Sequence, residues 1–475
     1  MLGMRYATLA AGLLATLLSG GARAESVDAL LTVRGGWEKN DSGKSLKQEF
    51  RFVNNLAAYG LNYAIDIPDG TPPGKCTLQS HEFRAKHLTL GMSSPAQANW
   101  YYQSFLSIQV DGMSLHDIPA TFREVRRFGP DTLLEGTWAT PKGPVFLRIL
   151  LRGRDDKLIL QLALAPETKA ERLEMRLSAY PQSFNQPRDR RLATATRQAE
   201  APATVVLDTA EEPWVLFYDE LLQNVKTSAG PCGVVYVPEE LESAVVGLGT
   251  YNVSTRLKGK PGVRTITVGV WDFTPQREAA PLRAYLSESG PTIAKDLARL
   301  AKTDWLASPV PAAELTPARV AEVARLAEAR RRSTAFDQMT DTVVTPHVAW
   351  GKPLAGGPVR LLVIGPRWEQ RETVELAQRL DVEYQTVSVS AADSLLNPSS
   401  LYLYGSYETY GYPRKNETDV IFEMAEKLRA ANDCVILTGF QSKLMPEQLR
   451  SELAERVHNG TGLILLGAAK GFQIG

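Results

Sequence analysis

The chain of 475 residues lacks an excess of either charge, since Lys plus Arg and Asp plus Glu number 53 each. No global field would draw it to nucleic acid or to an anionic membrane, so no nucleic-acid partner is expected. After the N-terminal run, no segment is apolar and long enough to span a bilayer, and no transmembrane segment is expected. The apolar fraction of 44% is ample for packed cores, and the length favours two or three domains.

Motifs for metals and phosphates are also lacking. The five histidines form no H-x-x-x-H or similar pair, so the sequence indicates no metal site. Neither G-x-G-x-x-G nor G-x-x-x-x-G-K-[ST] occurs, and Gly365-Pro366-Arg367 is not a phosphate loop. We therefore expect no cofactor.

The N-terminus predicts export. Arg5 supplies a positive charge, residues 7–18 form a short apolar run, and Ala22-Arg23-Ala24 is an A-x-A cleavage site. The run is shorter than the roughly 20 residues that span a bilayer, which favours a signal peptide over residues 1–24 rather than a membrane anchor. We expect a secreted, periplasmic or extracellular protein.

Few cysteines remain for that oxidising compartment. Cys434 lies in an apolar run and is interpreted as a small buried hydrophobe. Cys76 and Cys232 lie in turn-like contexts of one predicted domain, which makes them candidates for a disulfide. The sequence does not show whether these two residues meet.

Apolar residues alternate with period two from about residue 26 to residue 273, as in the run from Leu158 to Leu164. Turn formers such as Asp69-Gly70 and Asp111-Gly112 separate the runs, which indicates many short antiparallel strands. No Pro- or Gly-rich linker divides the region, so we favour one large β-sandwich over residues 25–275 to two smaller ones. Residues 187–204 are interpreted as a long surface loop.

A helical connector and linker are expected over residues 276–356. Helical spacing runs from residue 280 to residue 305, and Gly290-Pro291 is expected to break it into two pieces. Thr316-Pro317 is a good N-cap and first-turn pair for a further helix that ends near residue 332.

The pattern changes to β-α-β at residue 357. Expected strands cover residues 359–364, 382–389, 434–438 and 462–466, with amphipathic helices between them. Continuous apolar strands that alternate with helices predict a parallel sheet covered on both faces. We expect a doubly wound, flavodoxin-like α/β domain over residues 357–475. It is interpreted as incomplete, in a gene fragment or in the front part of a longer protein.

The segment from Asn432 to Gly475 resembles the core of the class I glutamine amidotransferase-like fold, as in the trehalose-utilisation family and the trimerisation domain of some β-galactosidases. The resemblance rests on the order of the elements and on Asn459-Gly460-Thr461-Gly462 before the last strand. It implies a nucleophilic Cys in the turn after that strand, where this chain has Gly467, Ala468 and Ala469. We expect a pseudoenzyme with no catalytic residue in this domain.

The strand rhythm from Trp214 to Phe273 resembles the large sandwich of galactose-mutarotase-like domains in carbohydrate-active proteins. That resemblance implies carbohydrate binding. A tyrosine-rich loop offers a second contact surface. Its candidate ligand or interface residues are Tyr402, Tyr404, Tyr407, Tyr410, Tyr412 and Arg414. Tyrosines of this kind suit sugar stacking or a protein interface, and simple packing is the other interpretation.

These patterns favour an exported, non-catalytic, carbohydrate-associated protein, or the front part of a larger glycan-processing protein. Docking or self-association is expected through the α/β domain. One alternative is a glycoside hydrolase whose carboxylates, Asp219 and Asp272, lie in the sandwich. Another is a structural or interaction protein of the cell envelope.

Overall fold

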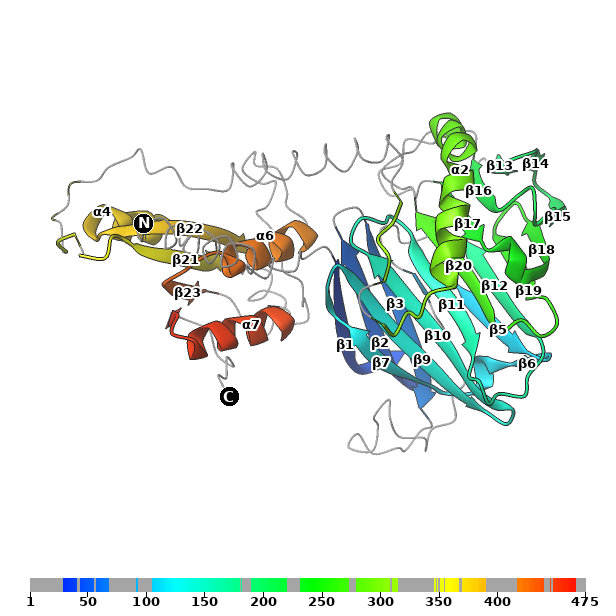
Figure 1. Cartoon of the computed structure of the whole chain (residues 1–475), viewed down its shortest axis with the longest axis horizontal. Coiled ribbons are helices and arrows are strands. Elements are labelled where there is room, and N and C mark those ends of the chain that lie inside the picture. The colour runs from blue at the N-terminus through cyan, green and yellow to red at the C-terminus, as the bar shows by residue number, and fades with distance from the viewer. Residues whose placement is uncertain are drawn as a thin grey trace, which may run out of the picture.

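A computed structural model gives the fold (Figure 1). The structure describes residues 29–40, 43–54, 57–67, 91–92, 105–179, 181, 189–219, 231–272, 279–307, 310–314, 346, 348, 351–353, 355–366, 370–389, 417–439, 445 and 447–466. Several predicted features lie outside these residues and stay predictions. They are the signal peptide, Cys76, the helix from Thr316, the tyrosine-rich loop with Arg414, and the turn Gly467, Ala468 and Ala469.

Most of the described chain forms antiparallel β-sheets. The largest sheet has nine strands, in the order β14 (Gln198–Glu200), β13 (Arg190–Ala193), β16 (Trp214–Asp219), β17 (Cys232–Tyr236), β20 (Thr265–Asp272), β11 (Leu158–Leu164), β10 (Gly143–Arg152), β9 (Asp131–Thr140) and β7 (Ala120–Arg126). Consecutive strands in the chain, such as β9, β10 and β11, pair as hairpins.

Two smaller antiparallel sheets lie against it. One has the order β15 (Ala203–Leu207), β18 (Leu241–Leu248), β19 (Val253–Gly259), β12 (Leu173–Ala179), β5 (Leu106–Val110) and β6 (Met113–Ser114). The other has the order β4 (Gly91–Met92), β3 (Ala58–Ile67), β2 (Gly43–Asn54), β1 (Ala29–Asn40) and β8 (Phe128–Gly129). Short 3-10 turns are η2 (Leu115–Asp117) and η3 (Pro238–Glu240).

One buried cluster joins the three sheets. β12 alternates buried and more exposed residues, as period-two spacing predicts for a strand with one face in a core. Leu160 of the large sheet, Met175 of the six-stranded sheet and Phe50 of the five-stranded sheet belong to the same cluster. The layers therefore form a β-sandwich, as predicted.

The opposite, outer face of the nine-stranded sheet is partly covered by α2 (Ala279–Ala301), which packs on β16, β17 and β20 (Figure 1). The predicted break at Gly290-Pro291 is wrong, because α2 is continuous with Pro291 inside it. Gly290 has a packing role. A Cβ there would lie 2.6 Å from Cδ1 of Trp214, so only glycine lets the helix approach β16 this closely.

The predicted surface loop over residues 187–204 is also wrong. It contains β13, β14 and the start of β15. Its polar residues are not solvated as expected, because Arg190 and Thr194 are buried and hydrogen-bonded to Asp219 and Glu212. A polar composition therefore concealed strands whose polar groups have partners in the fold.

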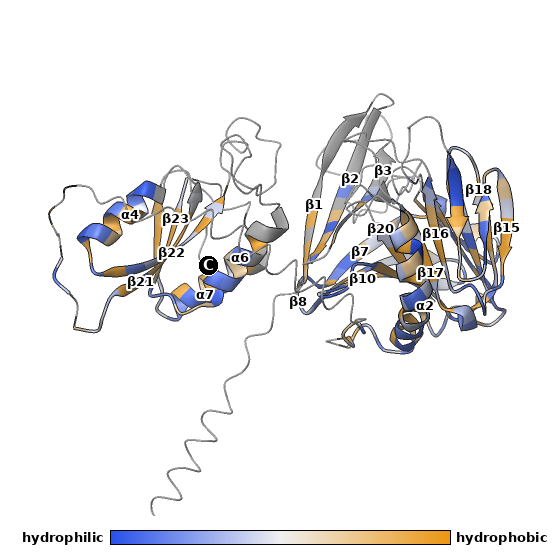
Figure 2. Cartoon of the chain, turned by 90° about the horizontal axis from the view of Figure 1, so that it is seen from above, coloured by the Kyte–Doolittle hydropathy of each residue, from blue (hydrophilic) through white to orange (hydrophobic). Residues whose placement is uncertain are grey.

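The C-terminal part contains a parallel sheet with the order β22 (Val382–Val389), β21 (Val359–Pro366), β23 (Cys434–Thr438) and β24 (Gly462–Leu466). Its helices are α4 (Gln370–Arg379), α6 (Glu417–Arg429) and α7 (Glu447–His458). Figure 2 shows both polar and apolar residues on α2 and α4, as expected for helices with one buried face. None of the helices in the described ranges is long and apolar enough to cross a membrane.

Candidate functional site

The two carboxylates proposed for hydrolysis lie at the same end of the nine-stranded sheet but not on neighbouring strands. Cys232 of β17 pairs with both Phe217 and Asp272, and Asp219 lies two residues beyond Phe217. Two strand spacings of about 4.8 Å and two residues of about 3.3 Å put the Cα atoms of Asp219 and Asp272 roughly 12 Å apart. Glycosidase carboxyl groups lie about 5–9.5 Å apart. The Cα positions of Asp219 and Asp272 therefore do not by themselves bring the two carboxyl groups together as such a pair.

Asp219 is held by Arg190. The Arg190 Nε donates to Asp219 Oδ1 at 2.8 Å, and the Arg190 side chain is 0% exposed. Its remaining nitrogens donate to the carbonyl oxygens of Tyr251, at 2.7 Å, and Pro181, at 2.6 Å. The pair thus ties the start of β13 to the end of β16 and to two turns. This arrangement gives Asp219 a structural role.

Cys232 is buried in β17, while its predicted disulfide partner Cys76 lies outside the described residues, so the disulfide stays a prediction. Cys434 is half-buried at the start of β23. Burial raises the pKa of its thiol, which suits the expected apolar role better than that of a nucleophile.

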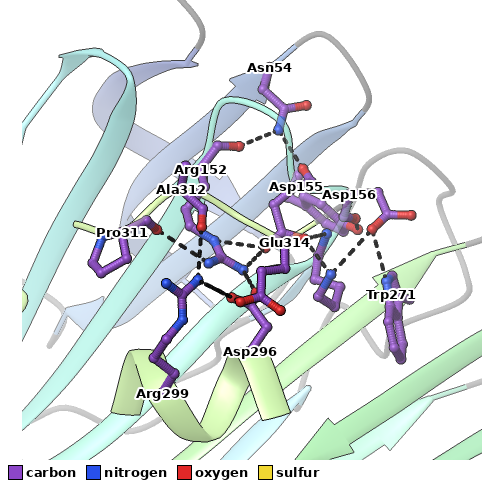
Figure 3. A network of polar contacts seen from close by, with 12 residues as sticks. Asn54, Arg152, Asp155, Asp156, Trp271, Asp296, Arg299, Pro311, Ala312 and Glu314 are labelled. Atoms are coloured by element: carbon purple, nitrogen blue, oxygen red, sulfur yellow. Dashed lines mark hydrogen bonds and ion pairs between the residues drawn. The ribbon is translucent and has the colours of Figure 1, made fainter. Parts of the chain in front are cut away.

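A network of charged side chains joins α2 to the turn between β10 and β11 (Figure 3). Arg152, at the end of β10, donates from Nε to Asp155 at 2.9 Å and from Nη2 to Asp296 of α2 at 2.6 Å. Arg299 also bonds Asp296, at 2.8 Å. Asn54 of β2 donates to the carbonyl oxygen of Arg152 at 2.7 Å. Segments far apart in the chain therefore meet at one point.

Lys157 completes the network. Its Nζ lies 2.5 Å from Asp155 and 3.5 Å from Asp156, and 5.2 Å from the centroid of the Trp271 ring. Trp271 donates from Nε1 to Asp156 at 3.1 Å and is 1% exposed, so it lies in the core. Burial alone would raise the pKa of Asp155, but Lys157 and Arg152 outweigh it and hold that pKa well below its usual range.

This network links α2 to the turn between β10 and β11 through ion pairs. Its three aspartates face the cations Arg152, Lys157 and Arg299. A carboxylate that is charged and tied to cations neither donates a proton nor attacks a substrate readily. In the ranges that the structure describes, no group of three or more His, Cys, Asp and Glu side chains is placed to hold a metal ion.

A second set of polar side chains crosses the outer face of the sheet in a row, one residue per strand. Arg123 on β7 donates to Glu135 on β9 at 2.9 Å, and Arg148 on β10 donates to the other oxygen of Glu135 at 3.0 Å. Arg148 also bonds Gln161 on β11, and Gln161 bonds Thr267 on β20 at 3.5 Å. These residues are direct cross-strand partners, so the register alone aligns them.

The row ends on Glu240 of η3. Its carboxyl group accepts hydrogen bonds from the hydroxyls of Thr265, at 2.5 Å, and Thr267, at 3.2 Å, and from the backbone N–H of Thr267. Burial raises the pKa of Glu240, and the bonds from these two threonines only partly oppose this. The row thus runs from an exposed guanidinium to a buried carboxyl group.

None of the residues in this row was predicted from the sequence as part of a site. Glu135, Arg148 and Gln161 interrupt apolar strands at the outward positions of the period-two pattern. From that alternation, polar side chains on the outer face of the sheet could have been predicted. Their alignment depends on the register, which the sequence pattern does not specify.

No protein-family model matches the chain, and a comparison with curated proteins gives no match. Solved structures similar to it include an α-N-acetylgalactosaminidase from Bifidobacterium bifidum, with 11% identity, 89% of this chain and 56% of that chain covered, and a TM-score of 0.31. A GH36 α-galactosidase from Geobacillus stearothermophilus is 11% identical. The match covers 90% of this chain and 73% of that chain, with a TM-score of 0.29. A proposed aldose 1-epimerase from Klebsiella pneumoniae is 9% identical. The match covers 56% of this chain and 88% of that chain, with a TM-score of 0.27. These TM-scores all lie below 0.5, so the fold and function of this chain rest on its own residues.

Proposed function

We propose that this chain is an exported, carbohydrate-associated protein that binds saccharide without cleaving it. The strand rhythm of a galactose-mutarotase-like sandwich supports carbohydrate binding, and the described sheets form a sandwich of the large size that this rhythm implied. Export rests on the signal-peptide pattern of residues 1–24.

The proposal that the chain does not cleave saccharide rests on one observation, the ion pairs formed by its buried carboxylates. Eight Asp and Glu residues are buried in the described part of the chain, and seven of them form ion pairs with Lys or Arg. The seven are Asp131, Glu135, Asp155, Glu212, Asp219, Asp296 and Glu423. Glycoside hydrolysis needs one carboxylic acid that keeps its proton and a second, accessible carboxylate close to it. Glu240, the eighth, forms no such ion pair among the described residues, but its carboxyl group is buried and accepts hydrogen bonds from Thr265 and Thr267. It is therefore not presented to a substrate, even though the exposed Glu239 lies beside it.

The α/β part is proposed to dock or self-associate rather than to catalyse. Its parallel sheet agrees with the order of elements in the amidotransferase-like and flavodoxin-like folds. The turn Gly467-Ala468-Ala469 supplies no nucleophile. The tyrosine-rich loop between β22 and α6 is the proposed contact surface, because tyrosines offer a flat apolar face and a hydroxyl group.

Calorimetric titration of the purified chain with a panel of oligosaccharides tests this function, with a hydrolysis assay on the same panel. We expect saturable binding of at least one saccharide and no release of reducing ends. Absence of any saccharide binding would overturn the carbohydrate role and leave a structural protein of the cell envelope. Hydrolysis that is lost in Asp219→Asn or Asp272→Asn, but not in the neighbouring Glu200→Gln, would establish the hydrolase alternative.

A further inference from the structure

The outer face of the nine-stranded sheet has two unlike halves. α2 and the segment after it bury an apolar half, to which Leu150, Ile159, Trp214 and Trp271 belong. The other half, with the outward residues of β7, β9 and β10 nearer the β9–β10 turn, carries Arg123, Glu135 and Arg148 of the polar row and is accessible at its β7 end. There the Arg123 side chain is 64% exposed, and that of Arg148 is 18% exposed.

This accessible end has a surplus of positive charge. Glu135 uses one oxygen for each arginine, so two guanidinium groups share a single carboxylate. Within the described residues, no hydrogen bond is formed by Nη2 of Arg148 or by Nε and Nη1 of Arg123. Guanidinium groups with free nitrogens bind carboxylates strongly because the two planar groups match in geometry.

An aromatic ring lies beside Arg148. Phe146 is two residues before Arg148 on β10, so both side chains lie on the outer face of the sheet. The Arg148 Cζ is 5.7 Å from the centroid of the Phe146 ring, which is half-buried. A flat apolar surface next to charged donors suits a sugar ring whose substituent is an anion.

The ion pair between Arg123 and Glu135 is not explained by its contribution to the stability of the fold. An ion pair with an arginine as exposed as Arg123 contributes little to the stability of the fold, because solvent screens the charges and ordering the side chain costs entropy. The buried part of the row, at Gln161 and Thr267, does not need Arg123 for its hydrogen bonds. The exposed Arg123 guanidinium group and the Nη2 of Arg148, which is unbonded within the described residues, are therefore available for a ligand.

We propose that this half of the sheet is a binding site for an acidic saccharide, in which Arg123 and Arg148 hold a uronate carboxylate and Phe146 contacts the sugar ring. Glu135 positions both guanidinium groups by fixing one edge of each. The proposal rests on the proposed function and narrows it to carbohydrates that carry carboxylates. Binding is expected to weaken as salt is raised, since the charges are partly exposed.

The test is calorimetric titration of the full chain with an oligogalacturonate and with the same oligomer after methyl esterification, which removes the charge. We expect the esterified oligomer to bind at least about tenfold more weakly, the loss of about one charged contact. Arg123→Gln and Arg148→Gln should each weaken oligogalacturonate binding about tenfold. Arg256→Gln is the matched control, because Arg256 is also an exposed arginine in a cross-strand ion pair, with Glu174 on the six-stranded sheet. It should leave binding unchanged.

Each outcome is decisive. Equal binding of the charged and esterified oligomers would overturn the acidic class and leave the carbohydrate role standing. Strong binding of oligogalacturonate that neither variant weakens would place the site elsewhere. Binding of other saccharides with none of oligogalacturonate would also overturn this proposal, whereas no binding of any saccharide would overturn the proposed function itself. Arg123→Gln changes an exposed side chain, so it keeps the test valid even if Arg148→Gln does not fold.

Discussion

Arg190 holds several chain segments together at one end of the sandwich through Asp219, Tyr251 and Pro181. We expect Arg190→Met to lower the free energy of unfolding by about 3 kcal/mol or more, because it removes one partner of a buried ion pair with Asp219. Urea unfolding measures this loss. The adjacent Arg191→Met is the control, since Arg191 is half-buried in ion pairs with Asp189 and Glu200, and it should cost less than about 1 kcal/mol. Equal losses in the two variants would contradict the anchoring role.

Glu240 predicts an unusual dependence of stability on pH. Its pKa in the folded state is raised above the ordinary value of 4.5, so its contribution to stability is present below that value and is lost as the pH rises. We expect Glu240→Gln to melt at a higher temperature than the unmodified chain at about pH 8, with a smaller difference at about pH 4. Thermal melts across that range test this, with Glu242→Gln as control, since Glu242 is an exposed glutamate paired with Lys258. A difference that grows toward acid would contradict it.

Glu212 predicts the opposite slope. Burial opposes its ionisation, but hydrogen bonds from Arg197, Thr194 and Thr196 outweigh burial and lower the pKa to about 2. Its contribution is present above the ordinary value of 4.5 and is lost as the pH falls toward about 2. We expect Glu212→Gln to flatten the decrease in melting temperature over that acidic interval. An unchanged slope would show that Glu212 is not the group that titrates there.

At the scale of elements, the contact between α2 and β16 depends on Gly290. We expect Gly290→Ala to destabilise the fold, because overpacking against Trp214 costs about 1–3 kcal/mol and exceeds the gain of up to about 1 kcal/mol in helix propensity. Gly356→Ala is the matched control, since a Cβ there meets nothing within 4 Å. Thermal unfolding compares the two. A Gly290→Ala protein as stable as the control would mean that α2 can move away from the sheet without cost.

The elements differ in how well the sequence predicted them. The strands β22, β23 and β24 have the predicted bounds, because each is a short run rich in β-branched or aliphatic residues between helical segments. This signal is local and holds both for β23, which is buried at its centre, and for β24, which is mostly exposed. By contrast, β13 and β14 were predicted as a loop. Buried polar groups in and beside them, such as Arg190 and Thr194, form hydrogen bonds with Asp219 and Glu212 on later segments, which no local pattern indicates.

At the scale of the whole molecule, the buried residues divide into separate clusters. Those of the sandwich and α2 are distinct from the cluster of the parallel sheet, which Leu30 of β1 also joins. We expect two calorimetric transitions. Leu160→Ala should lower only the transition of the sandwich, and Leu437→Ala only that of the parallel sheet, each by about 2–5 kcal/mol of stability. One transition that both variants shift equally would show that the two parts unfold as a unit.

The sequence by itself determined the order and type of most elements, because apolar period, caps and turn formers are local signals. It also determined that residues 467–469, Gly-Ala-Ala, contain no nucleophilic side chain. The tertiary structure decided which charges meet. Arg152 and Asp296 are 144 residues apart in the chain, and the row from Arg123 to Gln161 crosses four strands. Such contacts follow from strand order and register, which long-range packing sets, and so they lie beyond any local pattern.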